Sequence, residues 1–206
     1  MKEIKPHIIK VFLINFFLFQ SCFLFESCPD ALPYFTINGI NINNFKYTNE
    51  GLNPWKTIAG DGTLKWNEYF MRVGYDRNFT AQASLKSSYG LYALSCESDG
   101  YMGSKIGMDT LFIVTLNNYN ELFQANDTIN DIILTNDWTY KTEDFDNFQP
   151  ISTLLNENRE TIFNTNFEIK LNEKPSIFNQ LHSFKVILVL NNGETFESIS
   201  ETVSLQ

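Results

Sequence analysis

Residues 183–190 read SFKVILVL, and Asn191-Asn192-Gly193 separates them from residues 194–205, which read ETFESISETVSL. The first stretch is apolar at odd and even positions and rich in β-branched side chains, which is typical of a strand covered on both faces. Asparagine and glycine adopt the positive φ angles of tight turns at little steric cost. These residues therefore predict a β-hairpin that begins with a central strand.

Similar patterns recur along the chain. Residues 110–116 (TLFIVTL) predict a second central strand, and residues 165–171 alternate between apolar and polar side chains, as a half-buried strand does. The apolar residues fall on odd-numbered positions before Asn38-Gly39 and on even-numbered positions after it, which predicts a β-bulge. The segments on either side of residues 76–78 also alternate, so we expect a hairpin with residues 76–78 as its loop.

Only residues 118–124 and 151–160 have helical character, and Ser152 is a candidate N-cap for the second. Strands are expected before, between and after these two segments. The predicted fold class is therefore all-β, an immunoglobulin-like antiparallel β-sandwich with one or two short helical insertions. No linker-like segment interrupts residues 34–206, which we expect to form a single domain.

The composition bounds the function. The chain has 206 residues, of which 43% are hydrophobic and 19% charged, so it carries enough apolar surface for a folded core. Its formal net charge is −9. Because binding to a phosphate backbone requires a basic patch, we expect no nucleic-acid partner.

The beginning of the chain has the layout of an export signal. Lys2, Lys5 and Lys10 precede an apolar run at residues 11–25, which is shorter than the roughly 20 residues of a membrane-spanning helix. Inside this run, Phe19-Gln20-Ser21-Cys22 resembles the signal box of bacterial lipoproteins. The resemblance implies cleavage before the cysteine and attachment of a lipid to its thiol.

With Cys22 as the lipidated first residue, residues 1–21 are a signal peptide and residues 22–33 a tether. Two alternatives stay open: lipidation at Cys28, which ends a similar box, and an ordinary signal peptide without a lipid. The anchor predicts a protein of the cell envelope, at the outer membrane of a Gram-negative bacterium. The sequence after Cys22 lacks a run of acidic residues, which favours the periplasmic face.

Removal of residues 1–21 takes away three lysines and one glutamate, so the net charge changes from −9 to −11. It also leaves Cys28 and Cys96 as the cysteines besides Cys22, and an envelope location permits a disulfide between them. Lipidation of Cys28 would instead leave Cys96 as a single thiol. The spacings typical of zinc and haem sites are missing, so we assign no metal ligand and no cofactor.

Six short motifs occur in order along the chain: residues 28–30 (CPD), 34–37 (YFTI), 72–73 (RV), 109–114 (DTLFIV), 184–186 (FKV) and 192–194 (NGE). Together they resemble an uncharacterised family of Bacteroides-type lipoproteins of similar length. The resemblance covers most of the chain and implies a surface or periplasmic β-sandwich with no assigned activity, so it supplies no catalytic residue.

Groups suited to catalysis are few. His182 is the only histidine after the signal, and we expect it to be solvated at a strand end. Glu143, Asp144 and Asp146 form an acidic cluster with Asp137 nearby, but the glycine and bidentate glutamate of a calcium-binding EF-hand loop are missing. We expect solvated loop acids and assign no catalytic residue.

Two features indicate binding or modification. Asp127-Thr128-Ile129 resembles the acceptor triplet for O-glycosylation in Bacteroides-type envelope proteins, which makes Thr128 a candidate glycosylation site. Residues 109–111 have the same form but enter a predicted strand. Trp138 and Tyr140 lie in a polar segment and are candidate ligand contacts, whereas we expect Tyr69 in the core.

The sequence therefore predicts a lipid-anchored envelope protein that acts through binding or assembly, not catalysis. Its expected partners are the membrane, through the N-terminal lipid, and an envelope protein or a glycan. A first alternative is a structural subunit of a surface fibre, in which the final strand or the N-terminal segment is exchanged between subunits. A second is a carbohydrate-active enzyme, which requires two carboxylates facing each other across a cleft.

Overall fold

The computed structural model describes residues 31–47, 55–57, 63–80, 97–137, 147–176 and 180–206. The chain divides into two compact units, residues 1–31 with 90–97 and residues 32–89 with 98–206. Every described helix and strand belongs to the second unit. This unit is mostly β with one short α-helix, which confirms the predicted all-β class.

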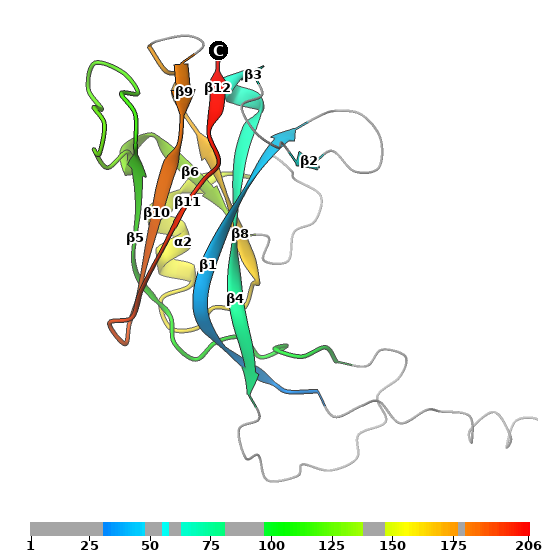
Figure 1. The fold of residues 1–206 in the computed structure, drawn as a ribbon. Coiled ribbons are helices and arrows are strands. Elements are labelled where there is room, and N and C mark those ends of the chain that lie inside the picture. Colours follow the sequence, from blue (N-terminus) through cyan, green and yellow to red (C-terminus); the bar gives the residue numbers. More distant parts are fainter. Residues whose placement is uncertain (1–30, 48–54, 58–62, 81–96, 138–146, 177–179) are drawn as a thin grey trace, which may run out of the picture. The chain divides into compact units, whose positions relative to one another are not determined.

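The largest sheet has six strands in the order β2-β1-β4-β8-β6-β7, and each strand is antiparallel to its neighbours (Figure 1). β1 and β4 form its longest ladder, and their register shifts between Ile37 and Gly39. This shift confirms the β-bulge predicted at Asn38-Gly39. The strands are β1 (Tyr34–Tyr47), β2 (Trp55–Thr57), β4 (Tyr69–Thr80), β6 (Ile133–Asn136), β7 (Gln149–Pro150) and β8 (Asn166–Leu171).

A second, antiparallel sheet has the order β11-β10-β5, formed by β5 (Met108–Thr115), β10 (Phe184–Leu190) and β11 (Thr195–Ile199). The turn between β10 and β11 contains Gly193 with φ of 85°, which confirms the predicted hairpin. A third sheet joins β3 (Thr63–Leu64), β12 (Val203–Leu205) and β9 (Gln180–His182), with β12 parallel to β3 and antiparallel to β9.

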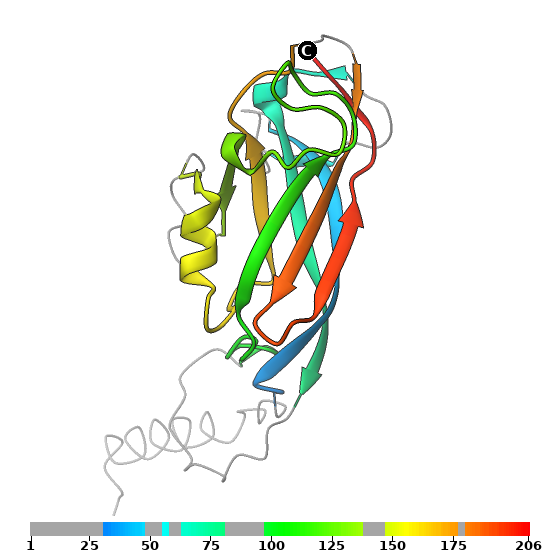
Figure 2. The same ribbon diagram turned by 90° about the vertical axis from the view of Figure 1, so that its left-hand side faces the viewer.

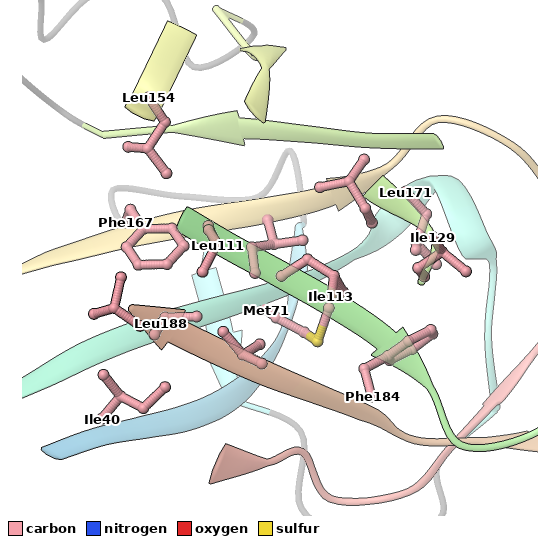
Figure 3. Close-up of a cluster of buried hydrophobic side chains, with 14 of the residues drawn as sticks. Ile40, Met71, Leu111, Ile113, Ile129, Leu154, Phe167, Leu171, Phe184 and Leu188 are labelled. Atoms are coloured by element: carbon pink, nitrogen blue, oxygen red, sulfur yellow. The ribbon is translucent and has the colours of Figure 1, made fainter. Parts of the chain in front are cut away.

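The strands β5, β10 and β11 lie in front of the strands β1, β4 and β8 in Figure 2. The two larger sheets share one hydrophobic core, because their inward side chains belong to a single buried cluster (Figure 3). Met71 of β4 and Phe167 of β8 are fully buried together with Leu111 of β5 and Phe184 and Leu188 of β10. The helix α2 (Ile151–Glu157) adds Leu154 to this cluster. Burial of these apolar surfaces is the main stabilisation of the unit.

Three local predictions are wrong. Residues 76–78 do not form a hairpin loop, because β4 runs through them and pairs with the start of β1. Residues 118–124 form turns and bends instead of a helix, and the Asn120 side chain accepts hydrogen bonds from the backbone N–H groups of Leu122 and Phe123. Ser152 lies inside α2, and the N-cap position is Pro150.

Candidate functional site

The outward face of the β11-β10-β5 sheet combines apolar side chains with a few polar and charged ones. Along β10, Phe184, Val186, Leu188 and Leu190 point into the core, and the residues between them point outward because side chains alternate along a strand. We call the outward residues of the three strands the sheet face. They are Thr110, Phe112, Val114, Lys185, Ile187, Val189, Thr195, Glu197 and Ile199.

Several apolar members of the sheet face are open to solvent. Phe112 is 40% exposed and Ile199 is 58% exposed. On β10, Ile187 pairs with Phe112 and Lys185 pairs with Ile199, and Ile187 and Val189 are half-buried. The prediction that residues 110–116 and 183–190 are covered on both faces is therefore wrong for Phe112 and only partly met at Ile187 and Val189, whereas the outward side chain of Val114 is buried. An exposed cluster of apolar residues on a folded protein is typical of an interaction surface.

One ion pair lies within the sheet face. The Nζ atom of Lys185 is 3.8 Å from a carboxylate oxygen of Glu197, and the glutamate side chain is 66% exposed. An exposed pair of this kind contributes little to stability. The two charges cancel, so the sheet face is neutral on a chain that is acidic as a whole.

The outer edge of β5 is closed by the chain itself. The side chain of Asn130 accepts a hydrogen bond from the backbone N–H of Ile113 and donates one to the carbonyl of Leu111, at 2.9 and 2.8 Å. Ile129 donates its backbone N–H to the carbonyl of Ile113 at 2.8 Å. β5 is thus an edge strand and not the predicted central strand, but its free backbone groups are partly satisfied within the chain.

The outer face of the six-stranded sheet has a different character. Glu168 of β8 is only 1% exposed, and its Oε1 atom accepts hydrogen bonds from Nε and Nη2 of Arg72 on β4, at 3.1 and 2.6 Å. The guanidinium of Arg72 also lies over the ring of Phe45, 4.7 Å from its centre. The sequence pattern predicted Glu168 on the polar side of its strand, and its burial was not foreseen.

Aromatic side chains continue this second face. The rings of Phe70 and Phe148 lie 5.3 Å apart, and the ammonium group of Lys170 lies within 5.5 Å of the centre of each ring. Phe70 and Phe148 are both buried. The charged groups of this face are therefore occupied in packing and ion pairing, which is a structural role.

His182 is not solvated, so that prediction is wrong. Its ring is fully buried, in edge contact with Tyr119 and stacked near Phe184, with ring centres 5.5 and 6.4 Å away. Neither ring nitrogen has a hydrogen-bond partner in the described part of the chain. Burial disfavours the charged imidazolium and lowers the pKa of His182, so the ring is neutral and serves as a packing residue.

The other predicted residues fall in several places. Thr128 is exposed beside the edge of β5, where the bridge between Val114 and Thr128 holds its segment. Tyr69 is fully buried in the core, as predicted, and donates its hydroxyl to Oδ1 of Asn44 at 2.9 Å. Asp137 is buried and accepts hydrogen bonds from the side chains of Asn158 and Asn164, so it is not a solvated loop acid.

The remaining predicted site residues lie outside the described residues. They are Cys22, Cys28, Cys96, Trp138, Tyr140, Glu143, Asp144 and Asp146. Among the residues that the structure does describe, no group of three or more histidine, cysteine or acidic side chains could hold a metal ion. None of the described helices is long and apolar enough to cross a membrane.

Sequence reasoning missed the sheet face. The signal for it is that residues 110–116 and 183–190 are apolar at both odd and even positions, a pattern that also fits a strand buried on both faces. The polar hairpin partner at residues 194–198 hints that this sheet ends at solvent. Comparison of the chain with family models, with curated proteins and with solved structures finds no match.

Proposed function

We propose that this chain is a lipid-anchored protein of the cell envelope that binds or assembles with another protein through the sheet face. The observation that carries the proposal is the exposure of Phe112 and Ile199 beside the half-buried Ile187 and Val189. Such residues gain free energy when a partner removes them from water, at roughly 25 cal/mol per Å² of apolar surface.

The closed edge of β5 supports contact through side chains. A strand added by a partner would need the backbone N–H of Ile113 and the carbonyl of Leu111, which Asn130 already binds. The neutral charge of the sheet face removes one obstacle to docking, since the chain elsewhere repels acidic partners.

We also infer that the fold is an immunoglobulin-like sandwich. The strand orders β1-β4-β8-β6 and β5-β10-β11 support this inference, because they correspond to the A-B-E-D and C-F-G sheets of a constant-type immunoglobulin domain. The shared hydrophobic core of the two sheets supports it as well. In this arrangement the sheet face is the outer surface of the C-F-G sheet, which leaves it available for a partner.

The proposed anchor at Cys22 rests on the signal box, and the proposed Cys28–Cys96 disulfide gains support from the described chain. Leu32 accepts a hydrogen bond from Gly100, Pro33 accepts one from Met102, and Phe35 donates one to Gly103. The two paired segments therefore run parallel to each other. Cys28 and Cys96 each precede the Leu32–Gly100 pair by four residues, a spacing that favours their approach.

Photo-crosslinking in cells tests the protein-binding proposal. A benzophenone amino acid replaces Phe112 in the full chain, and a matched variant carries it at Leu122, which is 79% exposed in the loop after β5. We expect a discrete protein adduct from position 112 and none from position 122. Absence of an adduct from position 112, or equal adducts from both positions, would overturn the proposal.

Intact mass spectrometry tests the anchor and the disulfide separately. The protein is extracted from membranes and measured with and without reductant, beside a Cys22→Ala variant. We expect a chain that begins at Cys22, carries acyl chains and gains two hydrogens on reduction. A start without acyl mass contradicts the anchor, and an unchanged mass on reduction contradicts the disulfide.

A further inference from the structure

A second exposed apolar cluster lies at one end of the described unit. Phe79 is 37% exposed, Tyr101 46%, Met102 42% and Phe163 53%, and we call these four residues the apolar end. In Figure 1 the start of β1, the end of β4 and the green segment that leads into β5 lie together at this end, and the C-terminus lies at the other. The apolar end is separate from the sheet face.

Backbone contacts hold these residues next to one another. The ring of Phe79 lies against Gly100. Ser104 and Ile162 exchange two backbone hydrogen bonds, at 2.8 and 3.1 Å, which bring Phe163 beside the turn that contains Tyr101 and Met102. The four side chains therefore come from three separate segments of the chain and gather at one place.

The turn at residues 100–103 presents two of these side chains at its tip. Gly103 donates its backbone N–H to the carbonyl of Gly100 at 2.8 Å, and both glycines have φ of 79°. Tyr101 and Met102 are thus the central residues of a tight turn, where polar or small residues are the usual choice. Such side chains at an exposed turn tip favour a contact that removes them from water.

The covalent path of the chain identifies the contact. Leu32 and Pro33 pair with the same turn, so the segment that leads back to Cys22 leaves the unit at the apolar end. Leu32 is ten positions after Cys22, and even a fully extended segment of that length spans only about 35 Å. A lipid on Cys22 would therefore hold the apolar end no farther from the bilayer than the span of this segment.

The chemistry of the apolar end suits a bilayer interface. Tyrosine favours the level of the lipid headgroups, where its apolar ring and its polar hydroxyl are both accommodated. Arg77 lies 5.3 Å from the ring centre of Phe79, and Lys105 lies 4.2 Å from that of Tyr34. Asp99 and Glu160 are also exposed in these segments, so net charge gives no preference for anionic lipids.

We propose that the apolar end rests on the surface of the lipid bilayer, with the side chains of Tyr101, Met102 and Phe163 inserted at headgroup level. This inference rests on the proposed lipid at Cys22, which holds the protein at the membrane. The contact fixes the orientation of the unit, so that the end with the C-terminus points away from the bilayer.

Photoactivatable lipids test this orientation. The lipidated full-length protein is reconstituted in phosphatidylcholine vesicles that contain a phosphatidylcholine with a diazirine near the headgroup. After illumination, we expect lipid adducts in the peptides that contain Tyr101, Met102 and Phe163. A triple variant, Tyr101→Ser, Met102→Ser and Phe163→Ser, should stay anchored and lose at least tenfold in adduct yield at these peptides.

The matched control changes exposed apolar residues near the opposite end. Leu122 is 79% and Leu181 46% exposed, and the variant Leu122→Ser with Leu181→Ser should keep the full adduct yield at residues 101–102. The absence of adducts at residues 101, 102 and 163 of the anchored wild type would overturn the inference. Equal labelling of the peptides that contain Leu122 and Leu181 would overturn it as well, because the unit would then have no preferred orientation.

A second arm separates this inference from the anchor. The lipid-free Cys22→Ala protein, from which the signal has been removed, is mixed with an excess of the same vesicles. Adducts at residues 101 and 102 in this arm would support the apolar end even if native Cys22 proves to carry no lipid. Anchored protein without those adducts would leave the anchor intact and contradict the apolar end. If neither arm gives adducts, the inference fails.

Discussion

The outer faces of the two larger sheets differ in which side chains they bury and which they expose. The six-stranded sheet buries the carboxylate of Glu168, paired with the partly exposed Arg72, on the side away from the core. The sheet formed by β5, β10 and β11 leaves Phe112 and Ile199 exposed on its outer side. Burying a charge and exposing apolar surface both cost free energy, so neither pattern arises from solvent preference alone.

This contrast between the two outer faces indicates which of them has a structural role. On the six-stranded sheet the charges of Arg72 and Glu168 are compensated within the chain. On the sheet face, the apolar side chains of Phe112 and Ile199 stay exposed, and compensation would have to come from another molecule. Substitutions on the first face should therefore act on stability, and substitutions on the second should act on binding.

The largest expected effect follows from the substitution Arg72→Met. It leaves the carboxylate of Glu168 without the guanidinium that neutralises it, in a place that is 1% exposed. We expect a loss of about 3 kcal/mol in the free energy of unfolding, near the lower end for buried pairs because the Arg72 side chain is 31% exposed. Urea denaturation followed by circular dichroism measures it.

The double variant Arg72→Met with Glu168→Leu is the matched control. It removes both charges, so most of the lost stability should return. The crosslink from position 112 should be unaffected in either variant at temperatures where the protein is folded. A loss below about 0.5 kcal/mol for Arg72→Met, as for an ordinary surface substitution, would show that this face is not structural.

His182 sharpens the comparison because it is a buried polar side chain without a hydrogen-bond partner in the described residues. Burial lowers its pKa in the folded state below the value of about 6.5 that it has in an unfolded chain. The unfolded state therefore binds the proton more readily. Stability from the neutral ring is fully present above the unfolded pKa and is lost as the pH falls through the folded pKa.

Thermal unfolding between pH 7 and pH 4 measures this effect. The variant His182→Phe keeps an aromatic ring between Tyr119 and Phe184, and its melting temperature should fall less on acidification than that of the wild type. We expect the effect to be smaller than that of Arg72→Met, because the ring stays neutral at neutral pH. Equal pH dependence of the two proteins would contradict the assignment of the acid sensitivity to His182.

The substitution Asn130→Ala separates the edge of β5 from the sheet face. It removes one acceptor for the backbone N–H of Ile113 and one donor to the carbonyl of Leu111. We expect a loss of about 1–2 kcal/mol in unfolding free energy. Because an open edge can pair with other chains, light scattering should also show faster aggregation.

Asn172→Ala is the control for this substitution, since the Asn172 side chain is exposed after β8 and its hydrogen bond to the carbonyl of Ile132 comes from the backbone, which the substitution keeps. Its unfolding free energy should stay within about 0.5 kcal/mol of the wild type. If Asn130→Ala behaves in the same way, the Asn130 side chain does not close the edge.

Local patterns predicted those elements that local chemistry determines. The β10–β11 hairpin follows from Asn191-Asn192-Gly193, and the bulge in β1 follows from a change of parity. The hairpin predicted at residues 76–78 failed because pairing with distant β1 supplies their hydrogen bonds. The helix predicted at residues 118–124 failed because Asn120 binds the backbone N–H groups of its neighbours in turns.

The sheet face and the apolar end could not be predicted from the sequence, for the same physical reason. Apolar residues at both odd and even positions of residues 110–116 fit a strand with two covered faces as well as one with a covered and an exposed face. Only the arrangement of the sheets shows which face of β5 remains at the surface. Likewise, Phe79, Tyr101 and Phe163 lie far apart in sequence, and pairing between their segments brings them together.

The smallest effect on stability, and the sharpest test of the comparison, comes from the substitution Ile199→Thr. Threonine keeps the β-branched shape that strands favour and removes apolar surface from a residue that is 58% exposed. We expect the unfolding free energy to change by less than about 1 kcal/mol, while the crosslink from position 112 falls at least fivefold. Leu181→Thr, an equivalent change on β9, should leave the crosslink unchanged. A lost crosslink with unchanged stability would assign the apolar residues of the sheet face to binding, whereas an unchanged crosslink would mean that a partner does not touch Ile199.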